Sequence, residues 1–182
     1  MKPALIIIDI QNDYFPGGRM ELEGSLPASQ KAETLLESFR RKGQPLVHIQ
    51  HVSNRPGASF FLPDTEGVNI HANVAPRAGE TVLQKHFPNG FRDTKLLEHL
   101  RSLGADHLVI AGMMTHMCVD ATTRAAFDLG FSCSLAHDAC ATRALAFGGE
   151  RVPAAQVHAA FVAALAGLYA KVQSAAEIAV QS

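Results

Sequence analysis

The sequence predicts an α/β fold in which a mostly parallel sheet of five to six strands lies between two layers of helices. Strand-like and helix-like segments alternate along all 182 residues, a pattern typical of parallel sheets with helical crossovers. The first strand-like segment, residues 5–8, is apolar at every position, as expected of a strand covered on both faces. We therefore expect a three-layer, Rossmann-like αβα sandwich, with residues 1–182 forming a single domain.

Short apolar runs bounded by glycine, proline or polar residues predict the strands. They are residues 5–9, 45–50, 81–84, 107–111 and 131–136. Apolar residues at helical spacing follow several of these runs, and glycines end three of the helices, at Gly43, Gly104 and Gly130. Pro153 begins a long helix. Ser174 and Glu177 have the spacing of a capping box, so a last helix is expected to begin there.

Residues 52–79 show no sustained periodicity and are rich in proline, glycine and asparagine. A loop of this length is uncommon in a compact domain and usually covers or forms a functional site. We therefore expect this segment to fold over the site and to determine which substrate fits.

The composition excludes two classes of function. The chain carries 16 basic and 17 acidic side chains without a block of either sign, for a net charge of −1. It therefore has no patch that would attract nucleic acid or an anionic membrane. The apolar run of residues 5–8 is far shorter than the ~20 residues that span a bilayer. No secretion signal is expected, and three cysteines form no disulfide framework. We expect a cytoplasmic protein whose partner is a small-molecule substrate.

Three residues from separate segments are expected to meet at one edge of the sheet. Asp9 and Lys85 lie at or just after the ends of two expected strands, and Cys118 follows a third strand at the start of a helix. In parallel sheets the carboxyl ends of the strands share one edge, where ligands bind. The sequence therefore predicts a site that contains a thiol, a carboxylate and an ammonium group.

A nucleophilic cysteine needs a lowered pKa and a nearby base, because the thiolate is the attacking species. The amino terminus of the helix and Lys85 are expected to favour the thiolate of Cys118, and Asp9 is the candidate base. Each residue also has a plain structural interpretation: a core cysteine, a capping or ion-paired aspartate, and a solvated lysine at a strand end. The residue types alone leave both interpretations open.

Three ordered motifs resemble those of one family. Residues 112–122 read Gly-Met-Met-Thr-His-Met-Cys-Val-Asp-Ala-Thr. They resemble the nucleophile motif of the isochorismatase-like cysteine hydrolases, a group that includes nicotinamidases and carbamoylases. Residues 5–15 are similar to the first strand of that family with its D-x-Q-x-D signature, and residues 85–91, Lys-His-Phe-Pro-Asn-Gly-Phe, resemble its lysine motif. The resemblance covers nearly the whole chain.

The resemblance implies a catalytic triad of Asp9, Lys85 and Cys118 and a cis peptide bond between Met113 and Met114. It also implies that the backbone amides of Met114 and Cys118 form the oxyanion hole. Residues that flank these segments or lie in the long loop are candidates for the substrate pocket, although packing also explains each of them: Tyr14, Phe15, Phe60 and His116. Arg55, also in the loop, either binds a substrate carboxylate through its planar guanidinium or is solvated.

The histidines after the second expected strand differ from the metal site of nicotinamidases, which contains an Asp-x-His element. Residues 48–51 read His-Ile-Gln-His, and His71 follows downstream. Three histidines suit zinc, but His48 and His51 lie three positions apart in or just after a strand, so their side chains tend toward opposite faces. We expect neither a bound metal nor another cofactor.

The sequence thus favours a cysteine hydrolase that cleaves the C–N bond of a small carboxamide or N-carbamoyl compound through a thioester. Two alternatives stay open. One is an isochorismatase-type enzyme that hydrolyses a vinyl ether without a thiol, and the other is a catalytically silent family member that serves as a binding module. The resemblance further implies a homodimer or homotetramer.

Overall fold

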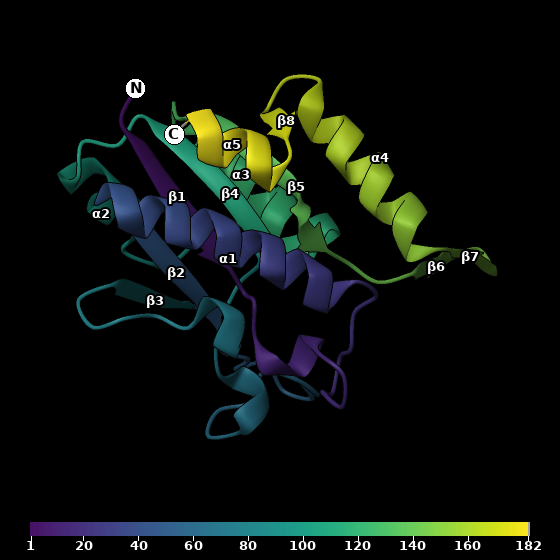
Figure 1. Cartoon of the computed structure of the whole chain (residues 1–182). Helices are drawn as coiled ribbons and strands as arrows, with labels where there is room; N and C mark the ends of the chain where they lie inside the picture. The colour runs from purple at the N-terminus through teal and green to yellow at the C-terminus, as the bar shows by residue number, and fades with distance from the viewer. Residues whose placement is uncertain (182) are drawn as a thin grey trace.

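A six-stranded sheet forms the centre of the computed structural model, which describes residues 1–181 (Figure 1). The strand order is β3-β2-β1-β4-β5-β8, and every neighbouring pair is parallel. The strands are β1 (Pro3–Ile8), β2 (Leu46–His51), β3 (Thr81–Lys85), β4 (His107–Met113), β5 (Ser132–Ala141) and β8 (Lys171–Gln173). The predicted α/β class is confirmed. Strand β8 was not predicted, because a three-residue strand has too few positions to show a pattern.

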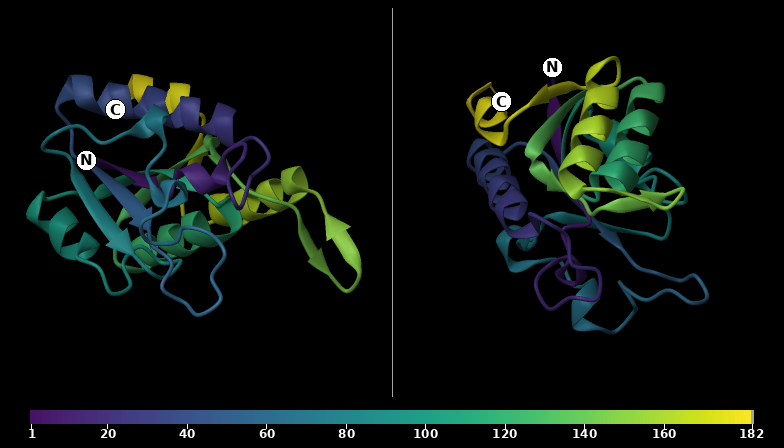
Figure 2. Two further views of the ribbon diagram at one scale, coloured as in Figure 1. Left: turned by 90° about the horizontal axis from the view of Figure 1, so that it is seen from below. Right: turned by 90° about the vertical axis from the view of Figure 1, so that its right-hand side faces the viewer.

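Helices cover both faces of the sheet and complete the three layers (Figure 2). On one face lie α1 (Ser25–Lys42) and α5 (Ala175–Gln181). On the other face lie α2 (Leu96–Ser102), α3 (Asp120–Asp128) and α4 (Ala154–Ala166).

The side chains of β1 alternate between two hydrophobic cores. Leu5 and Ile7 belong to the core beneath α1, whereas Ile6 and Ile8 belong to the core beneath α2, α3 and α4. All four are at most 1% exposed. The apolar run at the start of the sequence therefore reflects a central strand that is buried on both faces.

The helix ends follow the expected capping patterns. Gly43 ends α1 in the left-handed conformation, at φ +63°, and its amide donates to the carbonyl of Arg40 at 3.1 Å. Before α5, the Ser174 amide donates to a carboxylate oxygen of Glu177 at 2.8 Å, and the Glu177 amide donates to Ser174 Oγ at 3.2 Å. The predicted capping box is confirmed.

A two-stranded hairpin of β6 (Leu145–Phe147) and β7 (Glu150–Val152) projects from the body beyond α4 (Figures 1 and 2). Gly148 and Gly149, both at positive φ, form its turn, which is the backbone conformation that two-residue hairpin turns require. Within residues 1–181, no helix is long and apolar enough to cross a membrane.

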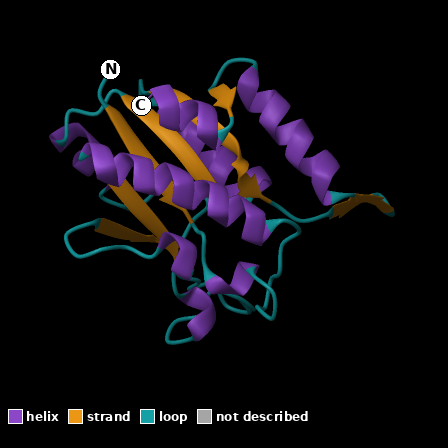
Figure 3. Ribbon diagram, viewed as in Figure 1, coloured by secondary structure: helices purple, strands orange, loops and turns teal. Residues whose placement is uncertain are grey.

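The segment 52–79 is an ordered loop on the lower side of the molecule in Figure 3, and it contains two short 3₁₀ turns, Glu66–Val68 and Ala72–Val74. Two side chains of the D-x-Q-x-D motif hold it. The amide of Gln11 donates to the Val68 carbonyl at 2.7 Å, and a carboxylate oxygen of Asp13 accepts from the Phe61 amide at 2.6 Å. The loop is therefore anchored to the segment that follows β1.

Candidate active site

Asp9, Lys85 and Cys118 meet at the carboxyl edge of the sheet. Asp9 directly follows β1, Lys85 is the last residue of β3, and Cys118 lies in a π-helical turn, Thr115–Val119, between β4 and α3. Lys85 Nζ donates to Asp9 Oδ2 at 2.6 Å and to Cys118 Sγ at 3.2 Å. Lys85 therefore contacts both of the other side chains that the topology placed at this edge.

A fourth residue, His51, completes the surroundings of the Lys85 ammonium. It ends β2, the strand between β1 and β3, and its Nδ1 lies 3.0 Å from Lys85 Nζ. An ammonium group has three N–H donors, and here they point at Asp9, His51 and Cys118. Lys85 is only 1% exposed, so this complete set of partners compensates for the burial of its charge.

The titration behaviour of the cluster follows from its burial. Burial acts to lower the pKa of Lys85, but the negative charge of Asp9 and the hydrogen bonds to Asp9 and Cys118 outweigh it and raise the pKa above its usual value. Burial lowers the pKa of His51 to about 4, and the charge of Lys85 contributes to this shift. At neutral pH the site therefore holds a charged lysine and a neutral histidine.

The pKa of Cys118 shifts in the direction opposite to the one expected from the sequence. Burial raises the pKa of the Cys118 thiol, and the adjacent negative charge of Asp9 raises it further, while Lys85 acts in the opposite direction. Cys118 is 6% exposed, so the loss of water around the sulfur outweighs the cation and the helix end. The thiol is protonated at rest.

The backbone around the site adopts rare conformations. The peptide bond between Met113 and Met114 is cis, and Asp9 has a φ of +50°. Gly112, at φ +145°, lies so close to β1 that a Cβ atom there would be 2.1 Å from the carbonyl oxygen of Ile8. Only glycine allows β4 this close approach at the end of the strand.

Cys118 opens into a pocket of about 180 Å³. Tyr14 and Phe60, two of the residues predicted to line a substrate pocket, lie on its wall, as does Met114. The other lining residues are His51, Ser53, Arg55, His86, Phe87, Pro88 and Met117. The long loop contributes Ser53, Arg55 and Phe60, so it covers the thiol as expected.

Two of the predicted pocket residues do not line this pocket. Phe15 is buried beside the loop, where its ring stacks on His71 at a centroid distance of 3.6 Å. His116 contacts the Thr142 hydroxyl and the edge of the Phe161 ring instead. Residues one or two positions apart on a tight helical turn point in different directions, so closeness in sequence to Tyr14 or Cys118 did not place these side chains in the pocket.

Two residues of the site, His51 and His86, were not predicted from the sequence to belong to it. His86 directly follows Lys85, and its Nδ1 donates to the Val52 carbonyl at 2.7 Å. The sequence suggests His51 only as a candidate metal ligand. A sequence cue existed for it, because its strand end shares an edge with those of Asp9 and Lys85.

The residues present do not fit a metal. His48 contacts Glu80 at 3.0 Å and His71 stacks on Phe15, so the three histidines do not meet. Asp9, His51 and Cys118 have ligand atoms within 4.8 Å of one another, the one such group found among the described residues. The ammonium of Lys85, however, already contacts all three, so a metal ion would meet a buried positive charge there.

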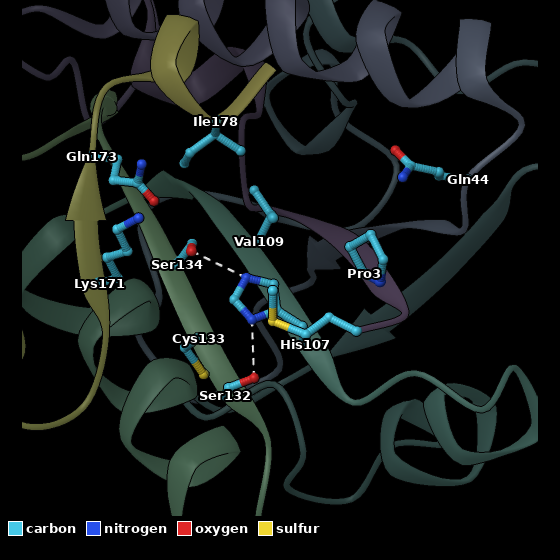
Figure 4. Close-up of a pocket in the computed structure, with 11 residues that line it drawn as sticks. Pro3, Gln44, His107, Val109, Ser132, Cys133, Ser134, Lys171, Gln173 and Ile178 are labelled. Atoms are coloured by element: carbon cyan, nitrogen blue, oxygen red, sulfur yellow. Dashed lines mark hydrogen bonds between the residues drawn. The ribbon is translucent and has the colours of Figure 1, made fainter. Parts of the chain in front are cut away.

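A second pocket, of about 400 Å³, lies at the opposite edge of the sheet (Figure 4). It is lined by residues from the starts of four strands, including Pro3, His107, Ser132 and Lys171. The His107 ring bridges the hydroxyls of Ser132 and Ser134, at 2.9 and 3.0 Å. No residue of the predicted site lies in it, and ligands of parallel sheets bind at the other edge.

Known proteins resemble this chain over nearly its whole length. A family model described as the isochorismatase domain matches residues 3–177. The chain belongs to the isochorismatase family. It is 49% identical over 174 residues to the uncharacterized isochorismatase family protein YddQ of Bacillus subtilis strain 168, covering 96% of this chain and 97% of that protein.

Solved structures of the isochorismatase family have the same fold. A crystal structure from Oleispira antarctica, assigned to the isochorismatase hydrolases, has a TM-score of 0.95 at 50% sequence identity. The alignment covers 98% of this chain and 96% of that chain. The N-carbamoylsarcosine amidase of Thermoplasma acidophilum has a TM-score of 0.82 at 26% sequence identity. The alignment covers 96% of this chain and 97% of that chain. The resemblance inferred from the three motifs is confirmed, and the chain is an isochorismatase-family hydrolase.

Proposed function

We propose that this isochorismatase-family hydrolase is a cysteine amidohydrolase that cleaves the C–N bond of a small carboxamide or N-carbamoyl compound. The observation that carries the proposal is the chain of contacts from the pocket inward. Cys118 lies on the pocket wall, its sulfur is 3.2 Å from Lys85 Nζ, and Lys85 is 2.6 Å from Asp9. The similarity to an N-carbamoylsarcosine amidase supports the same chemistry.

In the first half-reaction Asp9 removes the proton of the Cys118 thiol as the sulfur attacks the carbonyl carbon. Asp9 Oδ1 is buried and has no hydrogen-bond partner among the described residues, so a lone pair is available for this proton. Because the pKa of Cys118 is raised, proton transfer accompanies the attack. The amides of Met114 and Cys118 are proposed to stabilise the oxyanion.

The tetrahedral intermediate then breaks its C–N bond. Asp9 returns the proton to the departing nitrogen, ammonia leaves, and the acyl group stays on Cys118 as a thioester. A water molecule, deprotonated by Asp9, attacks this thioester, and Cys118 recovers its proton as the acid is released. Lys85 stays charged throughout, because its pKa is raised. Its hydrogen bonds hold the Asp9 carboxylate and the Cys118 sulfur in position.

The test measures ammonia release from primary amides, N-carbamoyl compounds and ureides. We expect Cys118→Ala to reduce kcat/KM by at least about a thousandfold, as loss of the nucleophile does in other hydrolases. The matched control is Cys133→Ala, whose thiol lies at the second pocket. Ammonia release that survives in Cys118→Ala, or vinyl-ether hydrolysis that does not need the thiol, would overturn the proposal.

Two further properties belong to this proposal. We expect the hydrolase to work in the cytoplasm, because all three cysteines are free, as is typical of a reducing compartment. We also expect a homodimer or homotetramer. Between Arg151 and Lys171 the sequence of α4 and its flanks contains no charged residue, and several alanines on the outer side of α4 are exposed.

A further inference from the structure

The wall of the catalytic pocket has an uneven charge distribution. Among the described residues that line it, Arg55 carries the one fixed positive charge, and none is aspartate or glutamate. The nearest acid is Asp9, which is 0% exposed and lies behind the wall with its charge balanced by Lys85 at 2.6 Å. The chain as a whole has a net charge of −1, so a positive pocket is a local property of this site.

Arg55 differs from the arginines that stabilise the fold. Arg40 is bound by Glu37 and Glu80, and Arg124 is bound by Asp120. Arg55 is exposed on the loop, and its guanidinium forms no hydrogen bond or ion pair with any described residue. Its charge reaches His51 and helps to lower the pKa of that ring. An arginine on a pocket wall that is committed to no protein partner is suited to an anion that comes from outside.

A second arginine adds to the positive potential at this end of the sheet. Arg143 follows β5, and its charge acts on Tyr14, a residue of the pocket wall, and on His116. Fixed charges of one sign around a partly enclosed site raise the local concentration of the oppositely charged ligand.

We infer that the substrate is a small anion, with a carboxylate that binds Arg55 at one end and a carboxamide or N-carbamoyl group that meets Cys118 at the other. The planar guanidinium is the side chain that matches a carboxylate through two parallel hydrogen bonds. The pocket volume of about 180 Å³ is below the range of about 300–1,000 Å³ that takes drug-sized ligands. Short N-carbamoyl amino acids and half-amides of short dicarboxylic acids fit both requirements. This inference rests on the proposed function of the same pocket.

The test compares pairs of substrates of similar size that differ in whether they carry a carboxylate, such as succinamate with butyramide, and N-carbamoylglycine with its methyl ester. For each pair the measured quantity is the ratio of kcat/KM for the anionic compound to kcat/KM for the neutral one. We expect this ratio to exceed one and to fall about ten- to hundredfold in Arg55→Gln, since a hydrogen bond to a charged group is lost. Arg55→Lys keeps the charge and should recover part of the ratio.

Raising the salt concentration should lower the ratio of the wild type as well, because salt screens the charge of Arg55. Arg41→Gln, an exposed arginine on α1 outside the pocket, is the matched control.

A binding measurement separates this inference from the proposed function. N-carbamoylglycine is titrated into Cys118→Ala by calorimetry, with and without Arg55→Gln, so that no turnover is needed. If ammonia release depends on Cys118 but neither the ratio nor the affinity responds to Arg55→Gln, the inference fails and the amidohydrolase stands. If no amide is hydrolysed but N-carbamoylglycine binds through Arg55, the proposed reaction fails and the anion site stands.

Discussion

The His51 ring accepts the third hydrogen bond of the Lys85 ammonium, with 3.0 Å between Nδ1 and Nζ. Since the pKa of Lys85 is raised and that of His51 is lowered to about 4, the lysine is the donor and Nδ1 is the acceptor. The backbone of His51 is itself fixed by the side-chain amide of Gln11. The nitrogen of that amide donates to the His51 carbonyl at 2.9 Å, and its oxygen accepts from the His51 N–H at 2.7 Å. His51 therefore positions Lys85 between Asp9 and Cys118.

Replacing His51 should impair catalysis through this contact. His51→Leu leaves one N–H of a buried ammonium unpaired, so we expect kcat to fall about ten- to hundredfold with a smaller change in KM. His51→Asn can offer an amide oxygen to Lys85 and should recover part of the rate. His99→Ala, on α2 and away from the pocket, serves as the control. Equal activity of His51→Leu and wild type would show that Lys85 does not need its third partner.

The raised pKa of Cys118 predicts how its alkylation depends on pH. Because the thiolate is the reactive form and burial with the Asp9 charge holds the thiol protonated, the rate with iodoacetamide should still rise about tenfold per pH unit beyond pH 8.5. A cysteine in an unfolded peptide levels off near that value. The rate is followed by mass spectrometry of the peptide that contains Cys118, and a plateau below pH 8 would contradict the prediction.

Asp9→Asn should change alkylation and catalysis in opposite directions. Removing the negative charge beside the sulfur lowers the pKa of Cys118, so more thiolate exists at pH 7 to 8 and alkylation becomes faster. Ammonia release should nevertheless fall by about 10²- to 10⁴-fold, because the proposed base is lost. If alkylation and ammonia release both slow down, Asp9 supports the local structure and does not act as the base.

The sequence predicted which strand ends form the site, but it did not predict the protonation state of Cys118 or the directions of two side chains near the site. The strand ends that carry Asp9 and Lys85 could be read from apolar runs, and parallel topology alone brings such ends together. The protonation state of Cys118 could not be read in this way, because it depends on how completely the pocket excludes water. The directions of Phe15 and His116 depend on the rotation of two short helical turns, which sequence neighbours do not specify. His51 was visible as a strand-end residue, but its contact with Lys85 required the structure.

The proposed self-association can be tested at the exposed apolar surface of the C-terminal half. Phe147, at the tip of the projecting hairpin, is 91% exposed, and Leu168, just after α4, is 65% exposed. Exposed apolar residues of this size favour association when they belong to a larger patch. We expect light scattering to give a mass of two or four times 19.5 kDa, and Phe147→Asp combined with Leu168→Asp to lower it. A mass of 19.5 kDa for the wild type would rule out the assembly.

Gly112 should tolerate substitution less well than glycines that only end helices. A Cβ atom at Gly112 would lie 2.1 Å from the carbonyl oxygen of Ile8, whereas nothing lies within 4 Å of a Cβ atom at Gly43. Both residues have positive φ, so alanine at either position incurs the strain of that conformation, about 1–2 kcal/mol. Gly112→Ala must also push β4 away from β1, which should add about 1–3 kcal/mol. Urea unfolding monitored by circular dichroism gives the free energy of unfolding of each variant.

Because β4 leads directly to Met114 and Cys118, folded Gly112→Ala should also lose activity, whereas Gly43→Ala should keep it. Equal losses of stability in the two variants would mean that β4 can shift without cost at this point.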